Sequence, residues 1–170
     1  FIVAENTEYA VEMHGITKIF DGKVVANKDA ELQLRKGEIL ALLGENGSGK
    51  TTLMNMLSGI YYPDGGEIKI NGKAVSMRSP KDAFDNGIGM IHQHFLLVDV
   101  LSAAENIVLG LEGGMNLDRR KVNEKVREIA ERYGFAVDPR KKVYDMAVSE
   151  KQTVEILKVL YRGAEILILD

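Results

Sequence analysis

The sequence predicts an α/β protein whose core is a mainly parallel sheet, with an antiparallel β portion at its amino-terminal end and a helical insertion between core strands. Three observations lead to this class. Strand-like patterns prevail up to about residue 94, helical patterns prevail from about residue 95 to 149, and a glycine-rich turn at 44–49 joins an apolar run to a helical pattern. Such alternation of strands and helices is typical of sheets that are covered by helices.

The β portion is predicted from alternation and from turn residues. Residues 9–13 alternate apolar and polar side chains, which predicts an edge strand that Gly15 ends. Residues 38–43 are an unbroken apolar run, which is typical of a strand buried on both faces. The other predicted strands are 24–34, 67–70 before a hairpin turn at Asn71-Gly72, 88–91 and 165–169.

The helices are predicted from their caps. Residues 50–58 form a helical pattern that Gly59 ends, and Ser102 with Glu105 fits a capping box. Asp118 is expected to cap a helix that runs to Tyr133. Ser149 is expected to precede the last helix, which Gly163 closes.

Composition excludes several classes of function. The 22 basic and 25 acidic side chains give a net charge of −3, which argues against general binding of nucleic acid. With no cysteine, disulfides, thiolate metal sites and cysteine nucleophiles are excluded. No apolar run approaches the roughly 18 residues of a membrane span. Because the sequence lacks an initiator Met and ends in an apolar run, we expect it to be part of a longer protein.

The strongest motif is Gly-Glu-Asn-Gly-Ser-Gly-Lys-Thr at 44–51, which matches the phosphate loop G-x-x-x-x-G-K-[ST]. Glycines let successive N–H groups turn inward at a helix amino terminus, where they bind phosphate oxygens. Lys50 adds a positive charge for the β- and γ-phosphates, and the Thr51 hydroxyl can bind Mg²⁺. The alternative is a glycine-rich turn with a surface lysine. The predicted nucleotide-binding residues of the loop are Gly44, Glu45, Asn46, Gly47, Ser48, Gly49, Lys50, Thr51 and Thr52.

Further segments narrow the class of phosphate-loop protein. They are Phe20 in Thr-Lys-Ile-Phe, Lys36-Gly37-Glu38-Ile39, Ser58-Gly59-Ile60, Gly65-Gly66-Glu67-Ile68, Gln93 in His-Gln-His-Phe, Ala104-Glu105-Asn106-Ile107, and Asp170 at the end of an apolar strand. With these segments the chain resembles the ATP-binding subunit of an ABC transporter over essentially its whole length.

The resemblance implies ATP and Mg²⁺ as cofactors and gives roles to single residues. Phe20 is expected to stack on adenine, although a core aromatic is the alternative. Gln93 matches the glutamine that ligates Mg²⁺ and senses the γ-phosphate, with a plain polar loop residue as the alternative. Asp170 matches the Walker B aspartate. The implied catalytic residues are Lys50, Gln93 and Asp170, and the implied metal ligands are Thr51, Gln93 and Asp170. We expect no metal site at His92 and His94.

The signature loop departs from the family pattern Leu-Ser-Gly-Gly-Gln. The corresponding residues are Met146, Ala147, Val148, Ser149 and Glu150. Ala147 lacks the hydroxyl that would bind a γ-phosphate, Ser149 replaces a glycine, and Glu150 brings a negative charge. We therefore expect a weakened signature face. The alternative role for Ser149 is that of a helix cap, and the two roles can coexist.

The resemblance also implies an organisation and a function. The expected parts are a β portion with the phosphate-loop core at 1–94, a helical subdomain at 95–149, and the signature helix with the Walker B strand at 150–170. Gln-x-Val-Glu-Ile after the signature resembles sugar and nucleoside importers. The implied role is to energise import of a sugar or nucleoside, at the cytoplasmic face of the membrane. The implied partners are a second ATPase domain, permease subunits and an extracytoplasmic substrate-binding protein, with no nucleic acid.

Two alternatives stay open at this stage, a soluble ABC ATPase of translation or DNA repair and a phosphate-loop kinase. The family's catalytic glutamate follows the Walker B aspartate, and its switch histidine comes later, so we expect these 170 residues alone to hydrolyse ATP poorly. Basic side chains at 119–142 alternate with acidic ones, which predicts a solvated helix face.

Overall fold

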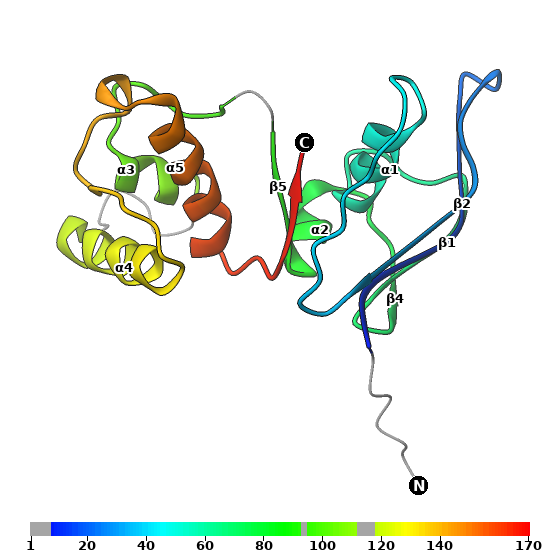
Figure 1. Ribbon diagram of the computed structural model, residues 1–170, viewed down its shortest axis with the longest axis horizontal. Helices are drawn as coiled ribbons and strands as arrows, with labels where there is room; N and C mark the ends of the chain where they lie inside the picture. The colour runs from blue at the N-terminus through cyan, green and yellow to red at the C-terminus, as the bar shows by residue number, and fades with distance from the viewer. Residues whose placement is uncertain (1–7, 93–94, 112–117) are drawn as a thin grey trace, which may run out of the picture. The chain divides into compact units, whose positions relative to one another are not determined.

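The computed structural model describes residues 8–92, 95–111 and 118–170 (Figure 1). The chain divides into two compact units, Phe1–Ile88 and Gly89–Asp170. The first unit contains the larger sheet. The second unit contains the helices of the insertion, which pack around a core of their own. Together they have the elements of the predicted α/β class.

The amino-terminal unit is built on an antiparallel sheet of four strands in the order β2-β1-β3-β4. The strands are β1 (Tyr9–Phe20), β2 (Val24–Arg35), β3 (Gly65–Ile70) and β4 (Lys73–Val75). Between β3 and β4, Asn71 and Gly72 have φ of 49° and 77°, the left-handed pair that a tight hairpin turn requires. The strands predicted at 24–34 and 67–70 and the turn between β3 and β4 are confirmed.

The prediction that Gly15 ends the first strand is wrong. Strand β1 runs on to Phe20, and its register against β2 shifts between Met13 and Ile16. A bulge accommodates the extra residue, so the strand bends at this point without ending. The inward side chains of β1 remain buried on both sides of the bulge, with Val11, Met13 and Ile16 fully covered.

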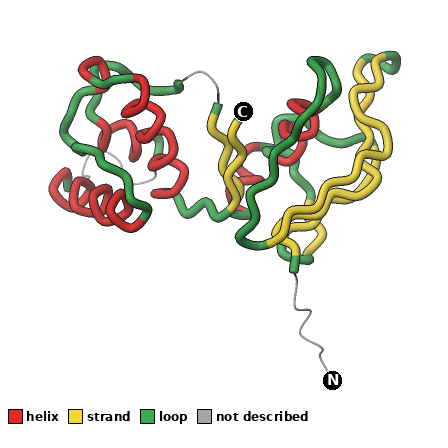
Figure 2. Tube along the Cα trace, viewed as in Figure 1, coloured by secondary structure: helices red, strands yellow, loops and turns green. Residues whose placement is uncertain are grey.

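The prediction of a strand at 38–43 is also wrong. These residues have no helix or strand assignment and lie on a long loop (Figure 2). Ile39 is 98% exposed and Leu43 is 92% exposed. An apolar run becomes a buried strand only when neighbouring strands hydrogen-bond to it. Among the described residues, no strand of the four-stranded sheet pairs with this run.

Two short helices complete the amino-terminal unit. Helix α1 (Lys50–Leu57) buries Leu53, Met56 and Leu57, and Ser58 follows as its carboxy-terminal cap. The predicted helix at 50–58 is thus confirmed to within one residue. Helix α2 (Pro80–Asp85) was not predicted. Its signal is Ser79, whose hydroxyl caps the helix, followed by Pro80 at the first helical position.

The carboxy-terminal unit combines a strand pair with a helical cluster. Strands β5 (Ile88–Ile91) and β6 (Ile166–Leu169) pair with each other and run in the same direction (Figure 1). The helical elements are α3 (Ala103–Val108), α4 (Arg119–Arg132), the 3-10 turn η2 (Val143–Asp145) and α5 (Val148–Tyr161). They enclose a core of Ala103, Ala104, Ile107, Val122, Val126, Ala130, Val143, Met146, Val154 and Leu157.

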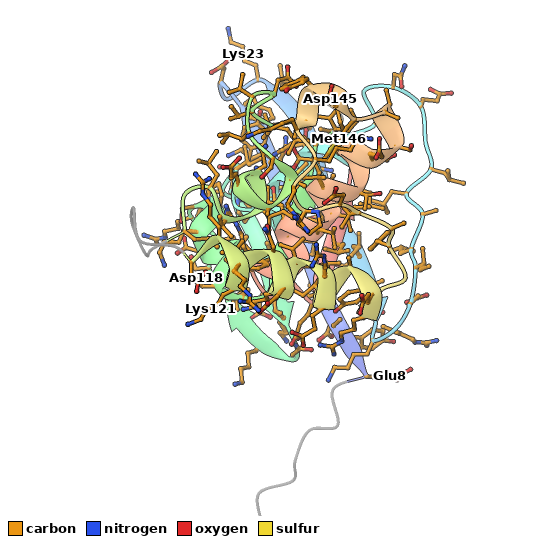
Figure 3. All side chains as sticks on the ribbon, turned by 90° about the vertical axis from the view of Figure 1, so that its left-hand side faces the viewer. Glu8, Lys23, Asp118, Lys121, Asp145 and Met146 are labelled. Carbon is orange, nitrogen blue, oxygen red and sulfur yellow. The ribbon has the colours of Figure 1, made fainter. Side chains whose placement is uncertain are left out.

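The helix caps in this unit largely follow the sequence. Ser102 and Glu105 form the predicted capping box, and Asp118 accepts from the N–H of Arg120 at 3.0 Å at the start of α4 (Figure 3). The prediction that Ser149 caps the last helix is wrong. Helix α5 begins at Val148, and the carboxylate of Glu150 accepts from the N–H of the capping residue Ala147 at 2.8 Å. This carboxylate supplies only the glutamate half of a capping box, because Ala147 has no side-chain oxygen to accept from the N–H groups of the first turn.

Candidate functional site

The loop at 44–49 leads directly into α1, and two of its glycines have left-handed backbone conformations. Gly47 has φ of 84° and Gly49 has φ of 88°, which other residues adopt only with strain. Helix α1 has no acidic residue in its first turn and no side-chain cap. The free N–H groups and the partial positive charge of its amino end are therefore not neutralised by a protein carboxylate, which suits an anion.

The side chain of Lys50 folds back over this loop. Its Nζ donates to the carbonyl oxygens of Gly44 and Glu45 at 2.8 Å each and to Oγ of Ser48 at 3.3 Å. The loop thus holds the ammonium group between its own acceptors. Phosphate oxygens, which carry negative charge, are stronger partners for this ammonium than neutral carbonyl oxygens. Of the residues that the sequence predicts as a phosphate site, Gly44, Glu45 and Ser48 contact the ammonium group of Lys50.

Strand β2 fixes the carboxy-terminal end of the loop. A Cβ on Gly49 would lie 2.4 Å from the carbonyl oxygen of Ala26, so only glycine fits this approach. Nδ2 of Asn27 also donates to the carbonyl oxygen of Gly49 at 3.3 Å. Asn27 was missed at the level of sequence, because no local pattern links it to a loop 22 residues away.

Phe20 lies at the end of β1 and packs edge-on against Tyr61, with ring centroids 5.2 Å apart and planes at 75°. Nζ of Lys18 lies 5.6 Å from the centroid of Phe20. Lys18 pairs with Asn27 in the strand register, so the backbone of Phe20 lies two residues, or about 7 Å, along β1 from the position opposite Asn27. The predicted adenine-stacking residue and the phosphate loop are therefore linked through one hairpin.

Asp64 fixes the Lys18 side chain beside Phe20. Its carboxylate accepts from the N–H of Ile19 at 2.7 Å and from Nζ of Lys18 at 3.1 Å. These two bonds, the backbone one first, hold the pKa of Asp64 below its ordinary value. The carboxylate stays ionised and keeps the cation in place.

Asp170 follows the last core strand and lies beside β5. Its N–H donates to the carbonyl oxygen of Ile91 at 3.1 Å, and its side chain is exposed. Ile91 is the last residue of β5, so Asp170 lies beside the carboxy-terminal end of that strand, which comes two residues before Gln93 in the sequence. Gln93 and His94 lie outside the described residues. Residues 8–92, 95–111 and 118–170 contain no cluster of three or more His, Asp or Glu side chains that could hold a metal ion.

The signature residues lie where η2 runs into α5 (Figure 3). Met146 is buried in the helical core, whereas Ala147, Val148 and Ser149 are exposed. The carboxylate of Glu150 accepts from Nζ of Lys141 at 2.7 and 2.8 Å. This pairing, followed by the bond from the Ala147 N–H, lowers the pKa of Glu150. The negative charge at this position therefore has a partner of its own.

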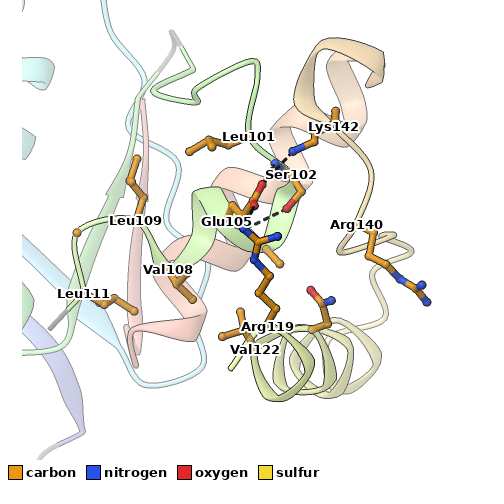
Figure 4. Close-up of a pocket in the computed structure, with 13 residues that line it drawn as sticks. Leu101, Ser102, Glu105, Val108, Leu109, Leu111, Arg119, Val122, Arg140 and Lys142 are labelled. Atoms are coloured by element: carbon orange, nitrogen blue, oxygen red, sulfur yellow. Dashed lines mark hydrogen bonds and ion pairs between the residues drawn. The ribbon is translucent and has the colours of Figure 1, made fainter. Parts of the chain in front are cut away.

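A cavity of about 640 Å³ lies in the helical cluster, and none of the predicted site residues that the structure describes lines it (Figure 4). At its edge Glu105 pairs with Lys142 at 3.1 Å and with Arg119 at 3.6 Å. The N–H of Ser102 and then Lys142 lower the pKa of Glu105, so the capping carboxylate stays ionised. The floor is apolar and includes Val108, Leu109, Leu111 and Val122. The carboxylate of Glu105 is thus satisfied by these two cations and by the N–H of Ser102.

In the described parts of the chain, no helix has both the length and the apolar character that crossing a bilayer requires.

The family model and the similar proteins point to the same family. Residues 27–170 match the family model described as ABC transporter. The chain is 52% identical to the guanosine import ATP-binding protein NupO of Bacillus subtilis and to the nucleoside import ATP-binding protein NupA of Lactococcus lactis, each over 96% of this chain and 32% of the relative. It is 48% identical to the ribose import ATP-binding protein RbsA 1 of Rubrobacter xylanophilus over 94% of this chain. The chain therefore spans about a third of the length of the curated relatives it matches.

Solved structures agree with the fold. A nucleotide-free ATP-binding cassette from an ABC transporter matches with a TM-score of 0.81 at 22% identity, over 95% of this chain and 68% of that one. The cbiO1 protein of Clostridium perfringens, part of the ABC transporter complex cbiONQ, matches with a TM-score of 0.80 at 26% identity, over 96% of this chain and 65% of that one.

Proposed function

This chain belongs to the ABC transporter family, and we propose that it binds ATP to energise the import of a nucleoside or sugar through a membrane permease. The observation that carries the proposal is the loop at 44–49, with Lys50 held at its centre and an uncapped helix amino end behind it. Relatives 48–52% identical to this chain are ATP-binding proteins of guanosine, nucleoside and ribose import. These relatives do not favour the soluble ATPase of translation or repair.

The residues of the loop and its surroundings fit a nucleotide by their chemistry. Lys50 would exchange its neutral carbonyl partners for β- and γ-phosphate oxygens, and the N–H groups at the start of α1 would bind the same anion. Phe20 would offer its ring to adenine from the hairpin that also contacts Gly49. The hydroxyl of Thr51 and the carboxylate of Asp170 are oxygen ligands of the type that Mg²⁺ prefers, and Gln93 would complete the set. A bound Mg²⁺ would neutralise phosphate charge during transfer.

The full assembly is part of the same proposal. We place the β portion and phosphate-loop core at 1–94, the helical subdomain at 95–149, and the signature helix with the Walker B strand at 150–170. The proposed partners are a second ATPase domain, permease subunits and an extracytoplasmic substrate-binding protein, and the proposed place is the cytoplasmic face of the membrane. The relatives are about three times as long as this chain, which leaves room for a second ATPase half.

Substitution of Lys50 tests the proposal. We expect Lys50→Ala in the transporter that contains this chain to weaken ATP binding by about 100-fold or more, because a charge-assisted contact to phosphate is worth about 3 kcal/mol. Uptake of a labelled nucleoside or of labelled ribose into vesicles should then stop. Lys121→Ala is the matched control, because Lys121 is exposed on α4 and distant in sequence from the loop. Unchanged ATP binding by Lys50→Ala would contradict the proposed function.

A further inference from the structure

Asn27 is a half-buried side chain of β2 that contacts the residue at which α1 opens. Its Nδ2 donates to the carbonyl oxygen of Gly49 at 3.3 Å. The same oxygen accepts the first hydrogen bond of the helix, from the N–H of Leu53 at 2.9 Å. A Cβ on Gly49 would lie 2.8 Å from Nδ2 of Asn27, so the carboxamide packs directly against the α-carbon of this glycine. One strand side chain thus fixes the carbonyl at which the phosphate loop becomes a helix.

A bulge in β2 turns Asn27 to the buried face of the sheet. Ile16 pairs with Ala30 and Lys18 pairs with Asn27, so two steps along β1 match three steps along β2. Paired residues of an antiparallel sheet point to the same face, and on β1 this is the face of the fully buried Ile16. Without the extra residue, the alternation along β2 would turn Asn27 to the opposite face. Asp29 completes the bulge with a left-handed φ of 47°, a strained conformation of the kind that re-aims side chains at functional sites.

The oxygen of the same carboxamide adds nothing to stability. Within residues 8–92, 95–111 and 118–170, Oδ1 of Asn27 is a buried atom that accepts no hydrogen bond. A buried acceptor without a donor is destabilising, so an apolar side chain of the same size would stabilise the fold at least as well. Loss of Nδ2 would also leave Gly49 satisfied, because its carbonyl oxygen still accepts from the N–H of Leu53. The contact between Asn27 and Gly49 is therefore not explained by stability.

Asn27 joins the two elements that the proposed ATP site uses. Phe20 lies at the end of β1, which pairs with β2 in the same hairpin. On the other side of the carboxamide lie Gly49 and Lys50, whose ammonium group the loop holds. We infer that Asn27 is a positioning residue of the ATP site, which fixes the start of α1 relative to the ring of Phe20. This inference rests on the proposed function, because it takes Phe20 and the phosphate loop as two ends of one nucleotide site.

Titration of the full transporter with a fluorescent ATP analogue tests this role in Asn27→Leu, Phe20→Ala and the double variant. Asn27→Leu keeps the volume of the side chain and removes its donor. We expect the Kd to rise by about fivefold, the effect of one neutral hydrogen bond, because the loop and the hairpin are no longer held together before binding. In the Phe20→Ala background the same change should raise the Kd by less than about twofold, because a fixed distance to a missing ring contributes nothing. Thermal unfolding should show that Asn27→Leu is at least as stable as the wild type.

Gln33→Leu is the matched control, because Gln33 is an exposed amide on the same strand, opposite Glu12. It should leave the Kd near the wild-type value in both backgrounds. Asn27→Ala removes the same donor without a branched side chain, and the same changes in Kd are expected of it. An unchanged Kd in both Asn27 variants, an equal loss with and without Phe20, or a lower unfolding temperature in both Asn27 variants overturns the inference. A wild-type transporter that binds no ATP would instead overturn the proposed function.

Discussion

Replacing Gly49 with alanine measures how tightly β2 constrains the phosphate loop. The added Cβ would lie 2.4 Å from the carbonyl oxygen of Ala26 and 2.8 Å from Nδ2 of Asn27, whereas ordinary contacts begin near 3.4 Å. The loop or the strand must then move by about 1 Å, which misaligns the groups that would bind phosphate. Losing one charge-assisted bond, worth up to about 3 kcal/mol, weakens binding by about 100-fold. The left-handed φ of 88° adds about 1 kcal/mol of strain for alanine. We expect the Kd for ATP to rise by about 100-fold or more.

Gly47 offers a control with the same backbone conformation and none of the crowding. Its φ is 84°, and nothing lies within 4 Å of the position of its Cβ. Gly47→Ala should therefore add only a backbone strain of about 1 kcal/mol, which corresponds to about a fivefold rise in the Kd for ATP. The double variant Asn27→Ala with Gly49→Ala should stay near Gly49→Ala, because the closest contact is with the backbone of Ala26.

Titration with a fluorescent ATP analogue measures the Kd of each variant, and thermal unfolding checks that each one folds. The reasoning requires Gly49→Ala to lose at least tenfold more affinity than Gly47→Ala. Equal losses in the two variants would mean that the crowding at Ala26 is irrelevant. Recovery of binding on adding Asn27→Ala would mean that the amide, and not the strand backbone, sets the loop.

Two further predictions concern the helical unit. Because its partners lower the pKa of Glu105, the stability that this carboxylate contributes is present above the ordinary value of 4.5 and is lost as pH falls through the lower folded value. Urea unfolding should therefore show a steeper loss of free energy between about pH 6 and about pH 3 in the wild type than in Glu105→Gln, and parallel curves would contradict this. At the signature, Ala147→Ser combined with Ser149→Gly should raise ATP turnover of the full transporter, and unchanged turnover would refute a weakened signature face.

The elements that sequence predicts correctly are those set by a few adjacent residues. The capping box of Ser102 and Glu105, the cap at Asp118 and the turn at Asn71-Gly72 each need only neighbours within four positions. The strand expected at 38–43 needs hydrogen-bond partners from elsewhere in the fold, and apolar composition alone does not supply them. The first strand runs past Gly15 for a related reason, because pairing with β2 tolerates a bulge that local propensity does not reveal.

The candidate site shows the same division between local and distant causes. The phosphate loop is predictable because its glycines and Lys50 are contiguous and act through their own backbone. The roles of Asn27 and Glu155 are not predictable from the sequence, because each side chain bonds to a backbone group that is far away in the sequence. Asn27 bonds to Gly49, and Glu155 bonds to Leu96. Such side chains look like ordinary strand and helix residues until the fold places their targets.

The two helix amino ends that we propose to face phosphate, those of α1 and α5, differ in one physical respect. Helix α1 has no acidic residue in its first turn, whereas α5 has Glu150, whose carboxylate already occupies the N–H of Ala147 and the ammonium of Lys141. The end of α5 thus supplies its own anion, and its field no longer favours an external one. Adding Glu150→Gln to the Ala147→Ser and Ser149→Gly variant should therefore raise turnover further than those two changes alone. If Glu150 only stabilises the helix, the triple variant will instead lose stability with no gain in turnover.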